Sequence, residues 1–496
     1  MTIQNNLFTD LRSFDLAAHI RDYGPPHYPT KRNPVGSLNE RFWGALAAGY
    51  NEILFENRES EFYTYAPPIG IYEPFTQHLL LDQIANDIWT ASESWPGYEP
   101  LAQLCNVRHL NGVLAHIKGF VQKEGAFDQH RDYIHLKNGV IDLSSGSPKL
   151  IPFDPKLISR NSIPVCYDPK AKCPRFQGEL LAPLCSDDRL LLQKLSGMYL
   201  SGTNFLQKIV ILQGAPESGK SQLAITTREL IGHHNCAELR VAHLDDRFEL
   251  GRYLGKILLI GSDVAGDFLS HPSAFRLKGL TGGDLLAGER KHSNRLFYMA
   301  GIFNVLITCN SRLVVKLECD RGAWARRILI FLYDQRKHLK SIPNFGHWLA
   351  QNEGSGILNL WLEGLLMAND EVAKYGTLLL TPTQKGRTDT LLDESEGVRH
   401  FVKSHITSDK VKDLTTDEII EKYAIYCAAP DRGWFINRRQ VERELPNIML
   451  EFFHTVANGN IVRNKKRARG YRNVAFVQED GIQENAEDAD YAENLI

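Results

Sequence analysis

Residues 214–221 read GAPESGKS and have the GxxxxGK[ST] spacing of a phosphate-binding loop. Its glycines let the backbone wrap around a phosphate, with successive N–H groups pointing inward at the start of a helix. Lys220 would neutralise the β- and γ-phosphates, and the Ser221 hydroxyl would join the ligands of Mg²⁺. We predict that ATP and Mg²⁺ bind here; the alternative is a chance match in a loop. The expected contact residues are Gly214, Ala215, Pro216, Glu217, Ser218, Gly219, Lys220, Ser221 and Gln222.

A site that hydrolyses ATP also needs a carboxylate beside the loop. Asp263 supplies one at the end of the apolar run KILLIGS. Its predicted roles are to hold the magnesium ion and to polarise the attacking water. The alternative is an aspartate that caps the next helix. Asp267 is the second candidate for the same role.

Three further polar residues follow along the chain. Asn310 ends the run NVLITCN and is predicted to orient the water near the γ-phosphate, with capping of the next segment as the alternative. Arg326 and Arg327 come just before the run ILIFLY. One of them is predicted to reach the nucleotide of a neighbouring subunit, and a surface salt bridge is the alternative for each.

Residues 280–292 read LTGGDLLAGERKH and combine a turn with a cationic end. Gly282 and Gly283 permit a tight turn, which Asp284 can fix through its own backbone. The residues after it predict a hairpin that bends at Gly288. An exposed surface turn is the alternative. The side chains expected at the tip to meet an acidic partner are Arg290, Lys291 and His292.

A second cationic stretch, residues 461–477, predicts a hairpin with a basic tip. No acid interrupts its cations, which can neutralise nucleic-acid phosphates, and Tyr471 adds an aromatic face. A solvated charge run is the alternative. The expected duplex-DNA contacts are Arg463, Lys465, Lys466, Arg467, Arg469 and Arg472.

The elements that position these residues follow from the hydrophobic pattern. Four short apolar runs, KIVILQ, KILLIGS, NVLITCN and RRILIFLY, alternate with helical or glycine-rich segments. Runs of this kind are typical of buried strands in a mostly parallel sheet. We therefore predict an α/β core over residues 204–375.

The regions on either side have their own patterns. Within residues 1–130, whose role the sequence does not indicate, we predict a helix over 39–55 and a strand over 61–67. Residues 131–203 predict hairpin strands and then a helix. Residues 390–478 predict helices over 394–405, 415–429 and 437–453 and then the basic hairpin, which is the order of a winged helix-turn-helix. Residues 479–496 form an acidic tail.

Composition limits the class of protein. The chain has 496 residues, of which 43% are hydrophobic and 23% charged, and its formal net charge is −2, so only local charge can indicate a partner. The eight cysteines include no CxxC pair, which predicts reduced thiols and a cytoplasmic location. No apolar run is long enough to cross a membrane, so we expect no membrane partner.

The order of these motifs resembles that of the superfamily 3 helicases, and more narrowly the phage/plasmid primase–helicase family with its poxvirus-type relatives. HLKNGVIDLSSG and YDPKAKCPRFQGEL resemble the N-terminal companion region of that family, and LKGLTGGDLLAGERKH and AWARRILIF resemble its core. The resemblance covers roughly residues 130–477. The fold class that it implies is α/β: a P-loop, AAA+-like core with an α+β N-terminal region and a C-terminal winged helix.

The resemblance also implies an ATP-driven DNA helicase for replication of a mobile element. Subunits would form a homo-hexameric ring with nucleotide between them, and single-stranded DNA would pass the hairpin of residues 280–292 in the central pore. Asp263 stands where the family usually has glutamate. Residues 1–130 are short for a primase, so we expect no primase activity and a separate primase acting in trans. An origin-binding initiator that melts duplex DNA and an ATP-switched defence protein are the alternatives.

Overall fold

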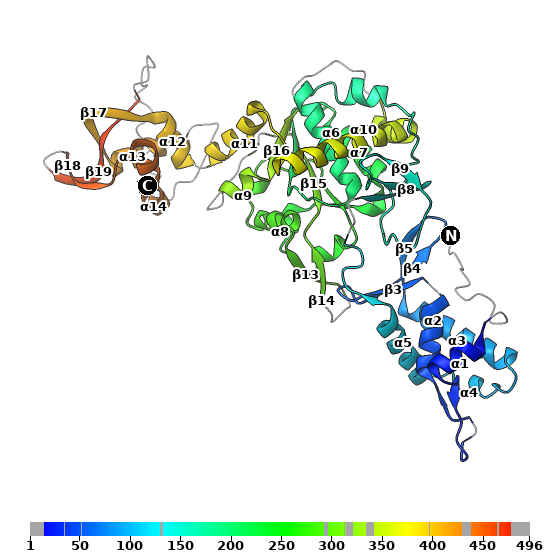
Figure 1. Ribbon diagram of the computed structural model, residues 1–496. Helices are drawn as coiled ribbons and strands as arrows, with labels where there is room; N and C mark the ends of the chain where they lie inside the picture. Colours follow the sequence, from blue (N-terminus) through cyan, green and yellow to red (C-terminus); the bar gives the residue numbers. More distant parts are fainter. Residues whose placement is uncertain are drawn as a thin grey trace. The chain divides into compact units, whose positions relative to one another are not determined.

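The computed structural model describes residues 14–33, 35–50, 52–128, 132–291, 296–311, 313, 321–333, 342–395, 397–428, 438–463 and 466–477 (Figure 1). The chain divides into two compact units. The first comprises Met1–Ala265, Pro272–Ser311 and Leu329–Leu380, and the second comprises Gly266–His271, Arg312–Ile328 and Thr381–Ile496.

A five-stranded sheet forms the centre of the first unit, in the order β11-β12-β15-β10-β16. The pairs β11–β12, β12–β15 and β15–β10 are parallel, as the four apolar runs predicted. The short strand β11 was not predicted, because three residues are too few to show a period. The strands are β10 (Ile209–Gln213), β11 (Cys236–Glu238), β12 (Leu258–Gly261), β15 (Asn304–Cys309) and β16 (Ile328–Leu332).

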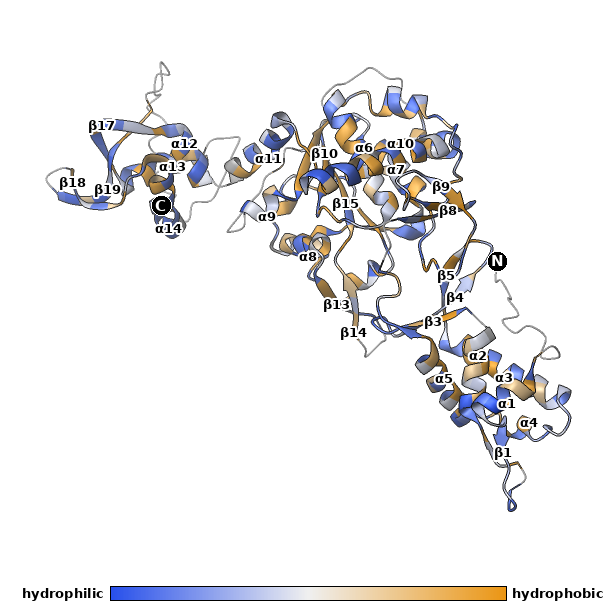
Figure 2. Ribbon diagram, in the orientation of Figure 1, coloured by the Kyte–Doolittle hydropathy of each residue, from blue (hydrophilic) through white to orange (hydrophobic). Residues whose placement is uncertain are grey.

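Three helices share one hydrophobic core with this sheet, and Figure 2 shows their ribbons with many hydrophobic residues. α10 contacts both α6 and α7. Small residues let α6 and α10 approach closely, since a Cβ atom at Gly197 would lie 2.4 Å from the backbone nitrogen of Leu365. The helices are α6 (Ser186–Ser201), α7 (Lys220–Ile231) and α10 (Phe345–Tyr375).

The region of residues 131–203 shares the hydrophobic core of this sheet. Ile134 and Leu136 belong to the same buried cluster as Leu258 and Trp361. Because α6 lies against α10, the two ranges that the sequence separated at residue 203 pack as one body. The predicted hairpin strands are β7 (Tyr133–Leu136), β8 (Gly139–Asp142) and β9 (Lys149–Ile151), followed by a π-helical turn at Phe176–Leu180.

The N-terminal region combines a helical cluster with the sheet β5-β4-β3-β6. The helix predicted over 39–55 is too long, because it ends at Tyr50 and Ile53 begins a strand paired with Thr64. Its elements are α1 (Leu16–Tyr23), β1 (His27–Tyr28), β2 (Ser37–Leu38), α2 (Glu40–Tyr50), β3 (Ile53–Glu56), β4 (Glu61–Ala66), β5 (Ile71–Phe75), α3 (Gln77–Ser94), α4 (Leu101–Leu104), α5 (Val107–Val121) and β6 (Gln122–Lys123).

The second unit contains a three-stranded sheet in the order β17-β19-β18, covered by helices, and the buried side chains of this unit include Phe401, Leu445 and Tyr471. Three of its helices, expected over 394–405, 415–429 and 437–453, and the hairpin were predicted. The strand β17 was not, because its polar residues lack an apolar alternation. The elements are α9 (Arg321–Ala325), α11 (Pro382–Ser395), α12 (Gly397–His405), β17 (Ile406–Thr415), α13 (Thr416–Ala428), α14 (Arg438–Phe453), β18 (Asn458–Arg463) and β19 (Lys466–Phe476).

The acidic tail of residues 479–496 lies outside the described residues. Among the helices that the structure does describe, none combines the length and the apolar character needed to cross a membrane.

Candidate functional site

The loop of residues 214–219 joins β10 to α7, as the spacing predicted. Gly219 is the N-cap of α7 at φ 102°, a conformation that disfavours other residues, and Glu217 is also left-handed at φ 62°. Gly214 lies against the end of β16, where a Cβ atom would come within 2.5 Å of the Tyr333 carbonyl oxygen. The backbone N–H groups at the start of α7 are therefore available to an anion at this loop.

Lys220 is the first residue of α7 and only 2% of it is exposed. Its ammonium group donates hydrogen bonds to the carbonyl oxygens of Gly214 (2.8 Å) and Ala215 (2.7 Å) and to Ser218 Oγ (3.1 Å). Burial lowers the pKa of Lys220, and the nearby charge of Asp263 opposes that shift. The loop thus holds a buried cation that can exchange its own carbonyl partners for phosphate oxygens.

The predicted pair Asp263 and Asn310 meets at the ends of the neighbouring strands β12 and β15. Asn310 Nδ2 donates a hydrogen bond to Asp263 Oδ1 at 3.0 Å, and both side chains are exposed. Asp263 has φ 49°, which is uncommon for a residue other than glycine. Thr308 fixes this backbone, since its Oγ1 accepts from Asp263 N (2.9 Å) and its carbonyl accepts from Val264 N (2.9 Å).

The strand order sets the distance between the loop and the carboxylate. β15 lies between β10 and β12, and neighbouring strands are about 4.8 Å apart. Ser221 is exposed on the first turn of α7, and Asp263 is exposed one strand beyond β15. Mg²⁺ usually takes one or two protein oxygens and completes its shell with water and phosphate, so these two donors fit it. Among the described residues, no group of three or more His, Cys, Asp or Glu side chains is arranged to hold a metal by itself.

Gln222 has a partner away from the loop. Its Oε1 accepts a hydrogen bond from Gly346 N at 2.7 Å, which ties α7 to the start of α10. The assignment of Gln222 to nucleotide binding stays a prediction, and its side chain also joins two helices.

The two arginines before β16 differ in exposure. Arg327 is 4% exposed and its Nη1 donates to the Ala323 carbonyl at 3.0 Å, whereas Arg326 is exposed. Of the two, only Arg326 is accessible to a second molecule. The sequence alone did not indicate which of the two arginines is exposed.

The hairpin that begins within residues 280–292 does not bend at the residue that was predicted. α8 (Arg276–Gly282) ends at Gly283 (φ 87°), and β13 (Leu285–Glu289) pairs antiparallel with β14 (Leu296–Ala300). The prediction of a bend at Gly288 is wrong, because Gly288 is paired with Phe297 inside the strands and a Cβ atom there would lie 2.3 Å from that ring.

The two described cations of this hairpin differ in their contacts. Arg290 Nη1 is 2.6 Å from Glu61 Oε1, and its guanidinium lies 5.6 Å from the centre of the Phe297 ring. Lys291 is exposed. His292 lies outside the described residues, so its predicted role is untested.

In the C-terminal hairpin too, one cation forms an ion pair within the fold and others are exposed. Arg463 Nε lies 2.7 Å from Glu418 Oε1, an ion pair that holds β18 to α13. Tyr471 is 1% exposed and packs in the core, so its predicted aromatic face is not accessible. Lys465 lies outside the described residues. The cations exposed on β19 are Lys466, Arg467, Arg469 and Arg472.

Two segments of the chain match known family models. Residues 108–181 match the family described as "D5 N terminal like", and residues 212–327 match a "Family of unknown function (DUF5906)". Both are typical of phage and plasmid primase–helicase proteins. The second match contains the loop, the Asp263–Asn310 pair and both arginines.

No curated protein matches the chain. The solved structures include the A form of the apo NrS-1 C-terminal region, at 13% identity, with 86% of this chain and 98% of that chain covered and a TM-score of 0.46. Another structure of the apo NrS-1 C-terminal region (305–718) has 13% identity, 86% and 97% coverage and a TM-score of 0.42. TM-scores below 0.5 do not establish a shared fold.

The contacts of Asp263 generate a testable prediction. Thr308→Val keeps the shape of the side chain but leaves Asp263 N without its acceptor. We expect a loss of about 1–3 kcal/mol in the free energy of unfolding, measured with urea. Thr308→Ser keeps the hydroxyl and is expected to lose less. Equal stability of the Val variant and the native chain would show that this hydrogen bond does not hold the turn.

Proposed function

We propose that the chain is an ATP-dependent DNA helicase that serves the replication of a phage, plasmid or other mobile element as a hexameric ring. The observation that carries the proposal is the meeting of a buried loop lysine with the hydrogen-bonded pair Asp263 and Asn310 across one sheet. The similarity of residues 108–181 and 212–327 to primase–helicase families supports it.

In this proposal each residue of the sheet edge has a distinct task. Lys220 leaves the loop carbonyls and neutralises the β- and γ-phosphates of ATP. Ser221 and Asp263 hold Mg²⁺, which would offset the negative charge that develops during phosphoryl transfer. Asn310 holds the Asp263 carboxylate in place, so that its second oxygen accepts a hydrogen bond from the attacking water.

The cationic surfaces supply the DNA contacts. Lys291, two residues after the end of β13, would pair with a phosphate of single-stranded DNA. The exposed cations of β19 would contact duplex DNA, with the helix–strand–helix–helix–hairpin order of residues 397–476 acting as a winged helix. Arg326 would reach the nucleotide of the neighbouring subunit, and a separate primase would act in trans.

An origin-binding initiator is the second candidate, because the exposed cations of β19 fit a duplex as well as a fork. Strand displacement on a forked substrate of arbitrary sequence separates the two functions. The helicase unwinds that substrate, whereas the initiator protects one sequence of its own replicon and leaves the fork intact.

The nucleotide site predicts two different defects. Lys220→Ala is expected to lose ATP binding and hydrolysis, because the cation that faces the phosphates is removed. Asp263→Asn is expected to bind ATP but to hydrolyse it at least about a hundredfold more slowly. Fluorescent-nucleotide titration and phosphate release measure the two steps. Asp267→Asn is the control; native hydrolysis by the Asp263 variant would transfer the role to Asp267.

The ring predicts complementation between defective subunits. An equimolar mixture of Lys220→Ala and Arg326→Ala chains is expected to regain part of the hydrolysis rate, because some interfaces then combine an intact loop with an intact arginine. A mixture of Lys220→Ala and Asp263→Asn is the matched control and should stay inactive, since both residues serve the same subunit's site. Equal inactivity of both mixtures, in rings shown to be mixed, would refute an arginine acting in trans.

The exposed cations of β19 predict a salt effect. Replacing Lys466, Arg467 and Arg469 with alanine is expected to weaken duplex binding and to reduce the slope of log K against log salt by about 0.9 for each phosphate that the variant no longer neutralises. Lys385→Ala, on α11, is the control and should leave the slope unchanged. Fluorescence anisotropy over a series of NaCl concentrations measures it. A native slope in the triple variant would make these cations a solvated surface.

A further inference from the structure

A groove of 1020 Å³ lies within the first unit, beside the hairpin β13–β14. One wall comes from the turn between β4 and β5, with Pro68 and Ile69. The other comes from the loop after β7, with Lys137, and from the segment before β12, with Lys256. Arg290, at the end of β13, also lines it.

The charge of the groove favours an anionic occupant. Its lining includes four cations, Lys137, Arg160, Lys256 and Arg290, but only two carboxylates, Glu61 and Glu73. The whole chain has a formal net charge of −2, so this excess of positive charge is local. Beside it, Ile69 is 39% exposed and gives the groove an apolar surface on which a base can rest.

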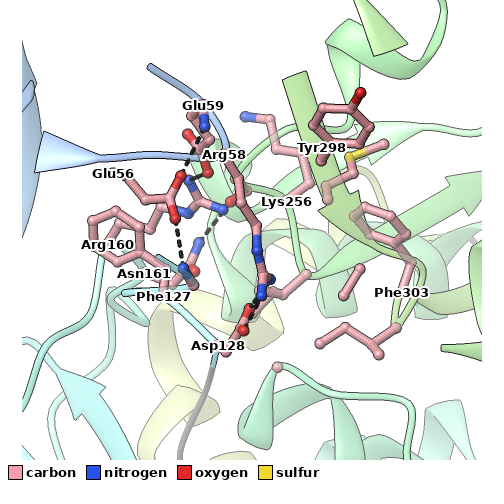
Figure 3. A pocket seen from close by; sticks show the side chains of 17 residues that line it. Glu56, Arg58, Glu59, Phe127, Asp128, Arg160, Asn161, Lys256, Tyr298 and Phe303 are labelled. Atoms are coloured by element: carbon pink, nitrogen blue, oxygen red, sulfur yellow. Dashed lines mark hydrogen bonds and ion pairs between the residues drawn. The ribbon is translucent and has the colours of Figure 1, made fainter. Parts of the chain in front are cut away.

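At the groove, Arg160 joins the N-terminal sheet to the core through an ion pair and a ring contact. Arg160 Nη1 lies 2.5 Å from Glu59 Oε1, and its guanidinium lies 4.6 Å from the centre of the Phe127 ring (Figure 3). Arg58 Nη1 lies 3.0 Å from Asp128 Oδ2. Of the four cations of the groove, Arg160 is engaged in the junction between the N-terminal sheet and the core, and Lys256 Nζ donates a hydrogen bond to the His234 carbonyl at 2.6 Å. The exposed Lys137 and the partly exposed Arg290 are therefore the ones that can meet a ligand.

The junction also connects the groove to the hairpin. Tyr298 N, on β14, donates a hydrogen bond to the Arg58 carbonyl at 3.1 Å. The hairpin is therefore attached to the turn between β3 and β4. Arg290 lines the groove and directly precedes the exposed Lys291, so a strand that contacts Lys291 lies close to the cations of the groove.

The ion pair of Arg290 shows what the groove would recognise. Glu61 Oε1 accepts from Arg290 Nη1 at 2.6 Å, and about a third of each side chain is exposed, at 38% and 32%. A phosphate oxygen has the same acceptor chemistry and suits the guanidinium fork at least as well. Because an exposed ion pair contributes little, a phosphate can replace the carboxylate.

We propose that this groove binds the backbone of single-stranded DNA, and that Glu61 holds Arg290 until a phosphate takes its place. The proposal rests on the proposed function, because it extends the path of a strand held at the hairpin. It adds a contact surface formed by the N-terminal region, for which the sequence indicated no role.

The test measures binding of a fluorescein-labelled thirty-nucleotide oligothymidine to the full chain, without nucleotide, over a series of NaCl concentrations. Lys137→Ala is expected to weaken binding about threefold or more and to reduce the salt slope by about 0.7, the value for one phosphate contact of a single strand. Lys149→Ala is the matched control, since it removes an exposed lysine of β9 that does not line the groove. Equal behaviour of the two variants would overturn the proposal.

A double-mutant cycle tests the part played by Glu61. Glu61→Gln is expected to tighten binding about threefold in the native background and to have no effect in the Arg290→Ala background, because the gain comes from the released arginine. The same gain in affinity in both backgrounds would show that Glu61 acts only by repelling the DNA charge, and would overturn its role as the partner of Arg290. Poly-glutamate that displaces the oligonucleotide at equal charge would make the groove a site for acidic polymers and also overturn the proposal.

These outcomes are separable from failure of the proposed function. ATP hydrolysis that does not respond to DNA would reject the helicase, while the Lys137 and Glu61 effects, measured without nucleotide, would still support the groove. If the native chain unwinds DNA but the Lys137→Ala and Lys149→Ala variants bind the oligothymidine equally, the groove proposal is rejected and the helicase proposal stands.

Discussion

The pairing of β15 with both β10 and β12 is the constraint on which the candidate nucleotide site depends. It brings the loop after β10, Asn310 after β15 and Asp263 after β12 to the same edge of one parallel sheet. Thr308 then adds a hydrogen bond to the backbone of Asp263, whose positive φ would otherwise be unfavourable. The hydrogen bond from Asn310 to Asp263 then aligns the two polar side chains on which the proposed chemistry depends.

Hydrogen bonding of the loop to itself explains how a buried lysine is tolerated. An ammonium group that is 2% exposed would be costly without partners, and Lys220 has three. The same hydrogen bonds tie Lys220 to Gly214, Ala215 and Ser218 of the loop. Binding of a phosphate then exchanges one set of acceptors for another, so the cost of removing the lysine from water is met before binding.

Ion pairing decides which of the many cations are accessible to a partner. Arg463 holds β18 to α13 through Glu418, and Arg327 is buried against Ala323, so both support the fold. Arg290 is paired with Glu61 but stays partly exposed, and Lys291 beside it is exposed. Neighbouring cations in the sequence therefore have different roles, because their partners come from distant segments.

The sequence by itself determined the features that depend on local pattern. Strand β10, the loop and α7 followed from GAPESGKS and its flanking runs, and Asp263 and Asn310 followed from their places at the ends of apolar runs. Only the tertiary structure decided what depends on distant contacts. It placed Gly288 within a strand against Phe297, turned Gln222 towards Gly346, and paired Arg290 with Glu61. Spacing along a chain limits which side chains share an element, but the packing of separate elements selects their partners.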